Sequence, residues 1–257
     1  MQHRRGCHMK KDKWAFFNWP DKIKVCGRMV SPNISFSKAG VITRCPGLYK
    51  LQYEDGIKVP LAKAIIQGGY FDALCSGTEP EEPLPNPDDI LVIKERFKEY
   101  KPLIVPGETQ KPFQLNLGFG TWIVIGFLDK YPDAIPNAPI IDVKFAQKPW
   151  DQRKHDNNRL QAAIYSKGLG HDWVQFHVAN FKKPGIQIFD TWVSQQDLDN
   201  AQAFLIEAAR KIVSGDRTFT PNTLCDWCDY AKAGHCPEFK EIKGSELDDL
   251  DNLDDLD

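Results

Sequence analysis

Two pairs of short apolar or alternating stretches predict two pairs of neighbouring β-strands. In the first pair, residues 123–128 and 140–145 flank a segment rich in Pro, Asp and Asn, which is typical of an irregular turn. In the second pair, residues 173–180 and 185–192 alternate between apolar and polar side chains on either side of a break that contains Lys and Pro. Each pair therefore indicates two strands that lie side by side in a sheet.

Stretches with helical spacing flank these strands. Ser35 precedes a helical turn that breaks at Pro46 and continues as a second short helix. Ser194 and Asp197 have the spacing of a capping box, and apolar residues recur along one stripe of the helix that they would open. Further helices are expected at residues 60–76, 90–100 and 151–168. Strands and helices together predict a mixed α/β fold with a central sheet and helices on its flanks.

The composition is that of a globular protein. The chain has 257 residues, of which 42% are hydrophobic and 26% are charged. It contains no uninterrupted apolar run of about 18 residues, the length of a membrane-spanning helix. The basic N-terminus is not followed by the apolar segment of a secretory signal. We therefore expect a cytoplasmic protein that has no membrane partner.

Negative charge is concentrated at the C-terminal end. Residues 244–257 carry seven acidic residues and no Lys or Arg, so the net charge of −2 becomes +5 for the rest of the chain. A mildly basic body is compatible with a nucleic-acid partner. We expect residues 1–33 to be irregular, residues 34–243 to form one domain and residues 244–257 to be a disordered tail. The tail either occupies a basic groove as a mimic of DNA, binds a protein partner, or is solvated without a role.

Asp129, Asp142 and Lys144 are the candidate catalytic residues. Asp129 follows the first apolar run, while Asp142 and Lys144 project from one face of the second. If the strands pair, two carboxylates and one ammonium group share a pocket. The carboxylates and the carbonyl oxygen of Val143 are hard ligands of the kind that Mg²⁺ and Mn²⁺ prefer. Lys144 would orient an attacking water or neutralise charge on a phosphate. The same residues would also suit a strand end and a solvated strand face.

Three motifs in order along the chain resemble those of the PD-(D/E)XK nuclease superfamily. They are Gly126-x-x-Asp129, Asp142-x-Lys144 and Gln161-x-x-x-Tyr165. The resemblance is to the RecB-like branch, which includes the AddB nuclease domain and the CRISPR-associated RecB-like exonucleases. It implies a restriction-endonuclease-like core and a metal-dependent exonuclease that acts on single-stranded DNA or DNA ends, in recombination, repair or phage DNA processing. It also assigns Gln161 and Tyr165 to positioning the active site or the DNA, although both would suit packing against the sheet.

Asp72 stands where this sequence departs from the family's pattern. The family often has Gly-x-x-x-His in this region, with the His as a metal ligand, whereas here Gly68 is followed four residues later by Asp72. Because Asp is itself a ligand of hard cations, Asp72 would complete the same metal site. It would equally suit the surface of a helix. The departure leaves open a second function, that of a DNA-binding or recombination partner that keeps the nuclease scaffold without catalysis.

Three of the seven cysteines are concentrated at Cys225, Cys228 and Cys236. In a chain without a secretion signal, this clustering favours a metal or cluster site over disulfide bonds. In RecB-like nucleases with a cluster, an N-terminal cysteine supplies the fourth ligand, and the resemblance assigns that place to Cys45. A [4Fe–4S] cluster on these thiolates would staple one edge of the fold. The alternatives are structural zinc, with Cys45 or His235 as the fourth ligand, and a buried free thiol at Cys45.

Overall fold

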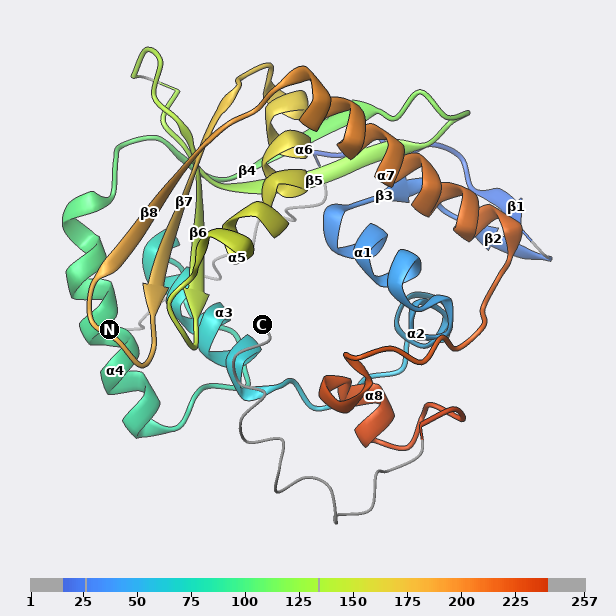
Figure 1. The fold of residues 1–257 in the computed structure, drawn as a ribbon, viewed down its shortest axis with the longest axis horizontal. Coiled ribbons are helices and arrows are strands. Elements are labelled where there is room, and N and C mark those ends of the chain that lie inside the picture. The colour runs from blue at the N-terminus through green and yellow to red at the C-terminus, as the bar shows by residue number, and fades with distance from the viewer. Residues whose placement is uncertain (1–15, 26, 134, 240–257) are drawn as a thin grey trace, which may run out of the picture.

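A six-stranded sheet forms the centre of the molecule in the computed structural model, which describes residues 16–25, 27–133 and 135–239 (Figure 1). Its strands are β3 (Asn33–Ile34), β4 (Glu108–Asn116), β5 (Ile123–Tyr131), β6 (Ile140–Ala146), β7 (Trp173–Asn180) and β8 (Ile186–Trp192). They lie in the order β3, β5, β6, β7, β8, and β4 pairs with β5. Two pairs, β3 with β5 and β6 with β7, are parallel, and the others are antiparallel, so the sheet is mixed.

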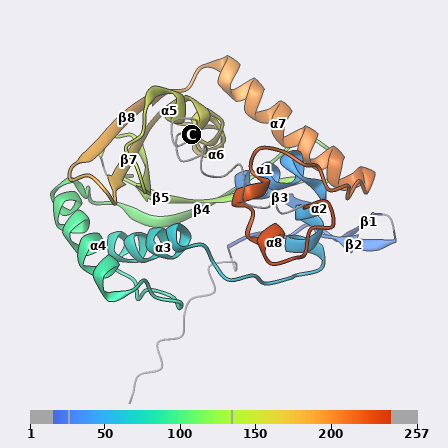
Figure 2. The ribbon, with the colours of Figure 1, turned by 60° about the horizontal axis from the view of Figure 1, so that its bottom comes forward.

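Helices cover both faces of this sheet (Figure 1, Figure 2). On one face, α1 (Phe36–Arg44), α6 (Arg159–Leu169) and α7 (Gln195–Ser214) share the larger hydrophobic core with β5, β6 and β7. On the other face, α3 (Lys63–Ser76) and α4 (Pro87–Tyr100) share a second apolar cluster with β6 and β7. Adjacent residues of β7, Val178 and Ala179, belong to different clusters, as strand alternation requires. The predicted class, an α/β fold with a mixed central sheet flanked by helices, is confirmed.

Local sequence signals set the ends of the helices. The capping box at the start of α7 is formed, because the Ser194 side chain accepts from the backbone N–H of Asp197 and the Asp197 carboxylate accepts from that of Ser194. The Ser35 side chain likewise caps α1. The apolar stripe of α7 is buried, and the helix packs against α1 and α6. The remaining short helices are α2 (Pro46–Tyr49), the π-helix η1 (Lys50–Glu54), η2 (Lys101–Leu103), η3 (Cys225–Trp227) and α8 (Asp229–Lys232).

The single helix expected over residues 151–168 is divided into α5 (Gln152–Asn157) and α6. Asn158 separates them, with φ −94° and ψ −1°. Its side-chain amide donates to the carbonyl oxygen of Lys154 over 2.7 Å. This local bond competes with the regular helical pattern, and the helix turns there.

Residues 1–33, expected to be irregular, contain a two-stranded hairpin within their described part. It is formed by β1 (Ile23–Val25) and β2 (Arg28–Val30). Gly27 in the connecting turn has φ 82°, a conformation that glycine adopts without steric cost. The predicted acidic tail, residues 244–257, lies outside the described residues. Within the part of the chain that the structure describes, none of the helices has the length and apolar character needed to traverse a lipid bilayer.

Phe113 of β4 packs between two glycines. A Cβ atom at Gly126 of β5 would lie 2.5 Å from the Phe113 ring, and a Cβ atom at Gly168 of α6 would lie equally close. The absence of side chains at these two glycines therefore lets α6 approach the sheet. Since α6 carries Gln161 and Tyr165, this packing sets the position of the third motif.

We expect Gly126→Ala to lower the free energy of unfolding by about 1–3 kcal/mol, because the added methyl group must displace the buried ring of Phe113. The matched variant is Gly40→Ala in α1, where a Cβ atom would meet nothing within 4 Å. That variant should be as stable as the wild type or gain up to about 1 kcal/mol, because Ala is the better helix former. Urea unfolding measures both, and equal stabilities of the two variants would contradict this packing.

Candidate metal centre and cysteine cavity

The strands β5 and β6 separate at the point where the candidate acids lie. The two strands are in register at Lys130 and Ile141, and Asp129 and Asp142 are the next residues along them. Oδ2 of Asp129 accepts a hydrogen bond of 2.8 Å from the backbone N–H of Val143. The Asp129 side chain therefore accepts the hydrogen bond that a backbone carbonyl group of β5 would accept in a regular strand ladder. Asp129 therefore lies alongside the next strand, as its position in the sequence predicts.

Asp142 is 1% exposed and is held by side chains from two elements. The ammonium group of Lys144 lies 2.7 Å from its Oδ2 atom, so both project from the same face of β6, as strand alternation predicts. The Tyr165 hydroxyl donates to its Oδ1 atom over 3.0 Å. Gln161 donates to the Tyr165 hydroxyl over 2.7 Å, which places both on one face of α6. The second and third motifs therefore meet in one network.

Carboxyl groups are crowded in this network, and the crowding disfavours their charged forms. Burial and the neighbouring Asp142 raise the pKa of Asp129 to about 8, although Lys144 acts in the opposite direction. Burial alone would lower the pKa of Lys144, but the carboxylates of Asp142 and Asp129 raise it above its ordinary value. Burial, followed by the same carboxylates, raises the pKa of Tyr165, so its hydroxyl remains a donor. A divalent cation would offset the crowded negative charge.

A small cavity lies beside Asp129. Its volume is about 10 Å³, close to that needed for one water molecule, and Asp72, Cys75, Thr109 and Val143 contribute to its lining. Asp72 comes from α3, so a third carboxylate approaches from a helix on the face opposite to α6. This oxygen-rich, negatively charged donor set fits Mg²⁺ or Mn²⁺. Among the residues that the structure describes, no three His, Cys, Asp or Glu side chains are gathered closely enough to hold a metal ion as they stand.

Gln110 and Cys75 are neighbours of the site that the sequence did not reveal. Gln110 donates from Nε2 to Oδ1 of Asp129 over 3.2 Å. Cys75 lies three residues after Asp72 on α3 and lines the same small cavity. Helical spacing from Asp72 was therefore an available signal for Cys75. Gln110 had no such signal, because its contact depends on how β4 pairs with β5.

The four predicted cysteine ligands line one cavity of about 530 Å³, whose wall is otherwise mainly apolar; they are Cys45, Cys225, Cys228 and Cys236. Cys45 and His235 are the two candidates for a fourth zinc ligand. Of these, Cys45 lines the cavity and His235 does not. The space is far larger than the roughly 30 Å³ of one water molecule. Four thiols on the wall of one cavity match the number of thiolates that a [4Fe–4S] cluster takes, although within the described residues no three of them are gathered closely enough to bind a metal as they stand.

Backbone amides already point at two of these sulfur atoms. The N–H of Leu48 donates to Sγ of Cys45 over 3.4 Å, and the N–H of Asn222 donates to Sγ of Cys225 over 3.2 Å. Hydrogen bonds to the sulfur atoms are one of the means by which proteins adjust the potential of an iron–sulfur cluster.

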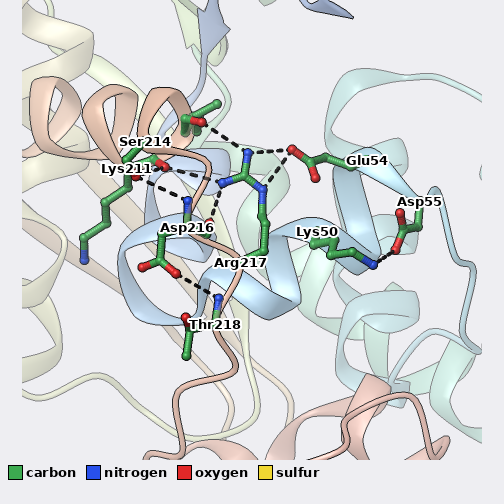
Figure 3. A network of polar contacts seen from close by, with 9 residues as sticks. Lys50, Glu54, Asp55, Lys211, Ser214, Asp216, Arg217 and Thr218 are labelled. Atoms are coloured by element: carbon green, nitrogen blue, oxygen red, sulfur yellow. Dashed lines mark hydrogen bonds and ion pairs between the residues drawn. The ribbon is translucent and has the colours of Figure 1, made fainter. Parts of the chain in front are cut away.

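An ion pair, here called the clasp, joins the two chain segments that carry the cysteines (Figure 3). Nε and Nη2 of Arg217 donate to Oε1 of Glu54 over 2.9 and 2.6 Å. Arg217 also donates to the carbonyl oxygen of Ile212 near the end of α7. Beside the clasp, the N–H of Gly47 donates to the carbonyl oxygen of Thr218 over 2.9 Å. These contacts join the segment that carries Cys45 to the segment that leads to Cys225.

The fold and the two sites define an α/β protein with an acidic, lysine-containing centre at a strand break and a separate thiol-lined cavity. No protein family and no curated protein matches the chain. Among solved structures, the chain is similar to one described as the crystal structure of SSO0001, with 14% sequence identity and a TM-score of 0.47. The match covers 80% of this chain and 86% of that chain.

We expect Glu54→Gln to lower the free energy of unfolding by about 3 kcal/mol, because it leaves the charge of Arg217 partly buried without its partner. The side chains of Glu54 and Arg217 are only 10% and 15% exposed. The matched variant is Lys50→Gln, which breaks the neighbouring pair with Asp55, whose side chains are 35% and 27% exposed (Figure 3). That pair should contribute no more than about 1 kcal/mol. Urea unfolding distinguishes the two, and similar losses would contradict the importance of the clasp.

Proposed function

We propose that the protein is a metal-dependent deoxyribonuclease that hydrolyses phosphodiester bonds. The observation that carries this proposal is the convergence of Asp129, Asp142 and Lys144 where β5 and β6 separate. Support comes from the direct contact between Tyr165 and Asp142, because it joins the third motif to the same centre. Two or three carboxylates beside one lysine are suited to holding a divalent cation against a phosphate.

The proposed metal ligands share oxygen donors and surround the break; they are Asp72, Asp129, Asp142 and the carbonyl group of Val143. A bound Mg²⁺ or Mn²⁺ ion would supply Lewis acidity and lower the pKa of a coordinated water. Lys144 lies 2.7 Å from Asp142 and orients the attacking water or neutralises charge that develops on the phosphate. Gln161 and Tyr165 fix the carboxylate of Asp142 and orient the DNA strand.

The proposed substrate is single-stranded DNA or a DNA end, which an exonuclease would digest during recombination, repair or phage DNA processing. The charge of +5 on residues 1–243 favours a polyanionic partner. The proposed location is the cytoplasm, where clustered thiols such as those of Cys225 and Cys228 stay reduced and available to a metal. In this proposal the acidic residues 244–257 are available to a protein partner.

The proposed occupant of the cysteine cavity is a [4Fe–4S] cluster on Cys45, Cys225, Cys228 and Cys236. Support comes from the shared cavity and from the amide groups that point at two of the sulfur atoms. The role would be structural, since the cluster would link the segment before η1 to the segment after α7. Zinc on the same thiols is the alternative.

Lys144→Ala and Asp142→Ala should each lower the rate of cleavage of labelled single-stranded DNA by at least about 100-fold, because each removes a charge at the reacting phosphate. The assay uses Mn²⁺ or Mg²⁺, with EDTA as the blank, and circular dichroism verifies folding. The matched variant Lys94→Ala removes an exposed lysine on α4 and should cleave at the wild-type rate. Wild-type activity of Lys144→Ala would contradict the assigned site. Wild-type protein that binds DNA without cutting it would favour the non-catalytic partner.

Protein purified without oxygen should be brown and contain iron and acid-labile sulfide in equal amounts, and Cys225→Ala should lose both. The matched variant Cys75→Ala should retain them, because Cys75 lines the small cavity beside Asp129. Elemental analysis and visible absorption provide the measurement. A colourless protein with stoichiometric zinc would contradict the cluster and favour the zinc alternative.

A further inference from the structure

We propose that Gln110 is a positioning residue, which fixes the carboxylate of Asp129 for metal binding at a cost in backbone strain. This inference rests on the proposed metal-dependent function and adds to it a residue from β4, outside the three motifs.

The backbone of Gln110 is in a conformation that side chains disfavour. Its φ angle is +51°, in the left-handed region, although it lies inside a strand. Outside glycine this region is sparsely populated, and Asn or Asp occupy it more readily than Gln does. Strain of this kind persists where the surrounding structure enforces it, and it gathers at functional sites.

The strain coincides with a gap in the strand ladder. Within β4, all of which the structure describes, every residue except Gln110 has a Cα partner in β5. The register would pair Gln110 with Asp129, since Thr109 faces Lys130 and Lys111 faces Leu128. The ladder therefore opens at the one residue of β5 that is the candidate metal ligand.

Across this gap the side chain of Gln110 replaces the missing backbone contact. Its Nε2 atom donates to Oδ1 of Asp129 over 3.2 Å, while the N–H of Val143 donates to Oδ2 over 2.8 Å. One donor comes from β4 and the other from β6, so both oxygen atoms of the carboxylate are held in place. Each carboxylate oxygen has further lone pairs with which to meet a cation. A neutral amide orients the carboxyl group of Asp129 without adding a positive charge that would repel a cation.

Three variants separate the amide from the strain. Gln110→Gly and Gln110→Ala both remove the amide, but only Gly adopts the left-handed backbone without strain. Gln110→Asn tolerates the conformation but is one methylene group too short for the same contact. If Gln110 positions Asp129, all three should bind Mn²⁺ about 10- to 100-fold more weakly than the wild type, as is typical when a ligand loses its supporting hydrogen bond. The thermal midpoint in EDTA should be higher for Gln110→Gly than for Gln110→Ala.

Calorimetric titration of the wild type and the variants with Mn²⁺ alone tests this role. The matched variant is Gln114→Ala in the same strand, whose amide donates to the carbonyl oxygen of Asn18 and whose loss should leave Mn²⁺ affinity unchanged. In the cleavage assay, saturating Mn²⁺ should restore most of the rate of Gln110→Gly. A merely structural role predicts instead that affinity follows stability and is preserved in Gln110→Gly. That result overturns the role of Gln110 and leaves the nuclease proposal standing, whereas a wild type that binds no Mn²⁺ overturns both.

Discussion

The buried carboxyl groups of Asp129 and Asp142 are confined near the ammonium group of Lys144 where β5 and β6 separate, and the rest of the centre depends on this confinement. In water, Asp129 and Asp142 would move apart, but here each is tied to a different element. Asp129 bonds to the backbone of β6, and Asp142 bonds to Tyr165 of α6. The position of α6 depends in turn on the contact of Phe113 with two glycines. Ordinary packing of helix on sheet therefore maintains the crowding that raises the pKa of Asp129.

The two cavities differ in their donor atoms. The carboxylates of Asp72 and Asp129 line the small cavity, whereas the larger cavity next to α2 has four thiols together with the carboxylates of Asp226, Asp229 and Glu238. Hard cations prefer the first set and soft metals the second. The thiol of Cys75 also lines the small, oxygen-rich cavity. Burial and the negative charge of Asp72 raise the pKa of this thiol, which keeps it protonated and a poor competitor for metal.

Regular periodicity made much of the fold and of the centre predictable. A period of two placed Asp142 and Lys144 on one face, and a spacing of four placed Gln161 with Tyr165. The capping box at Ser194 and both strand pairs were equally local signals. The break at Asn158 and the conformation of Gln110 were not predictable, because each depends on contacts beyond the pattern of hydrophobic residues. The metal, the cluster and the DNA substrate remain predictions, because they depend on partners outside the chain.

The clasp constrains the order in which the parts of the chain can fold. Glu54 and Arg217 are 163 residues apart in sequence, and all strands of the central sheet except the short β3 lie between them. Closing so long a loop costs entropy before any contact is gained, and such distant pairings slow folding. A ribosome synthesises the N-terminal part first, so Glu54 cannot pair with Arg217 until the whole sheet has been synthesised. The first helices can therefore take their final place only late in translation, when the segment after α7 has emerged.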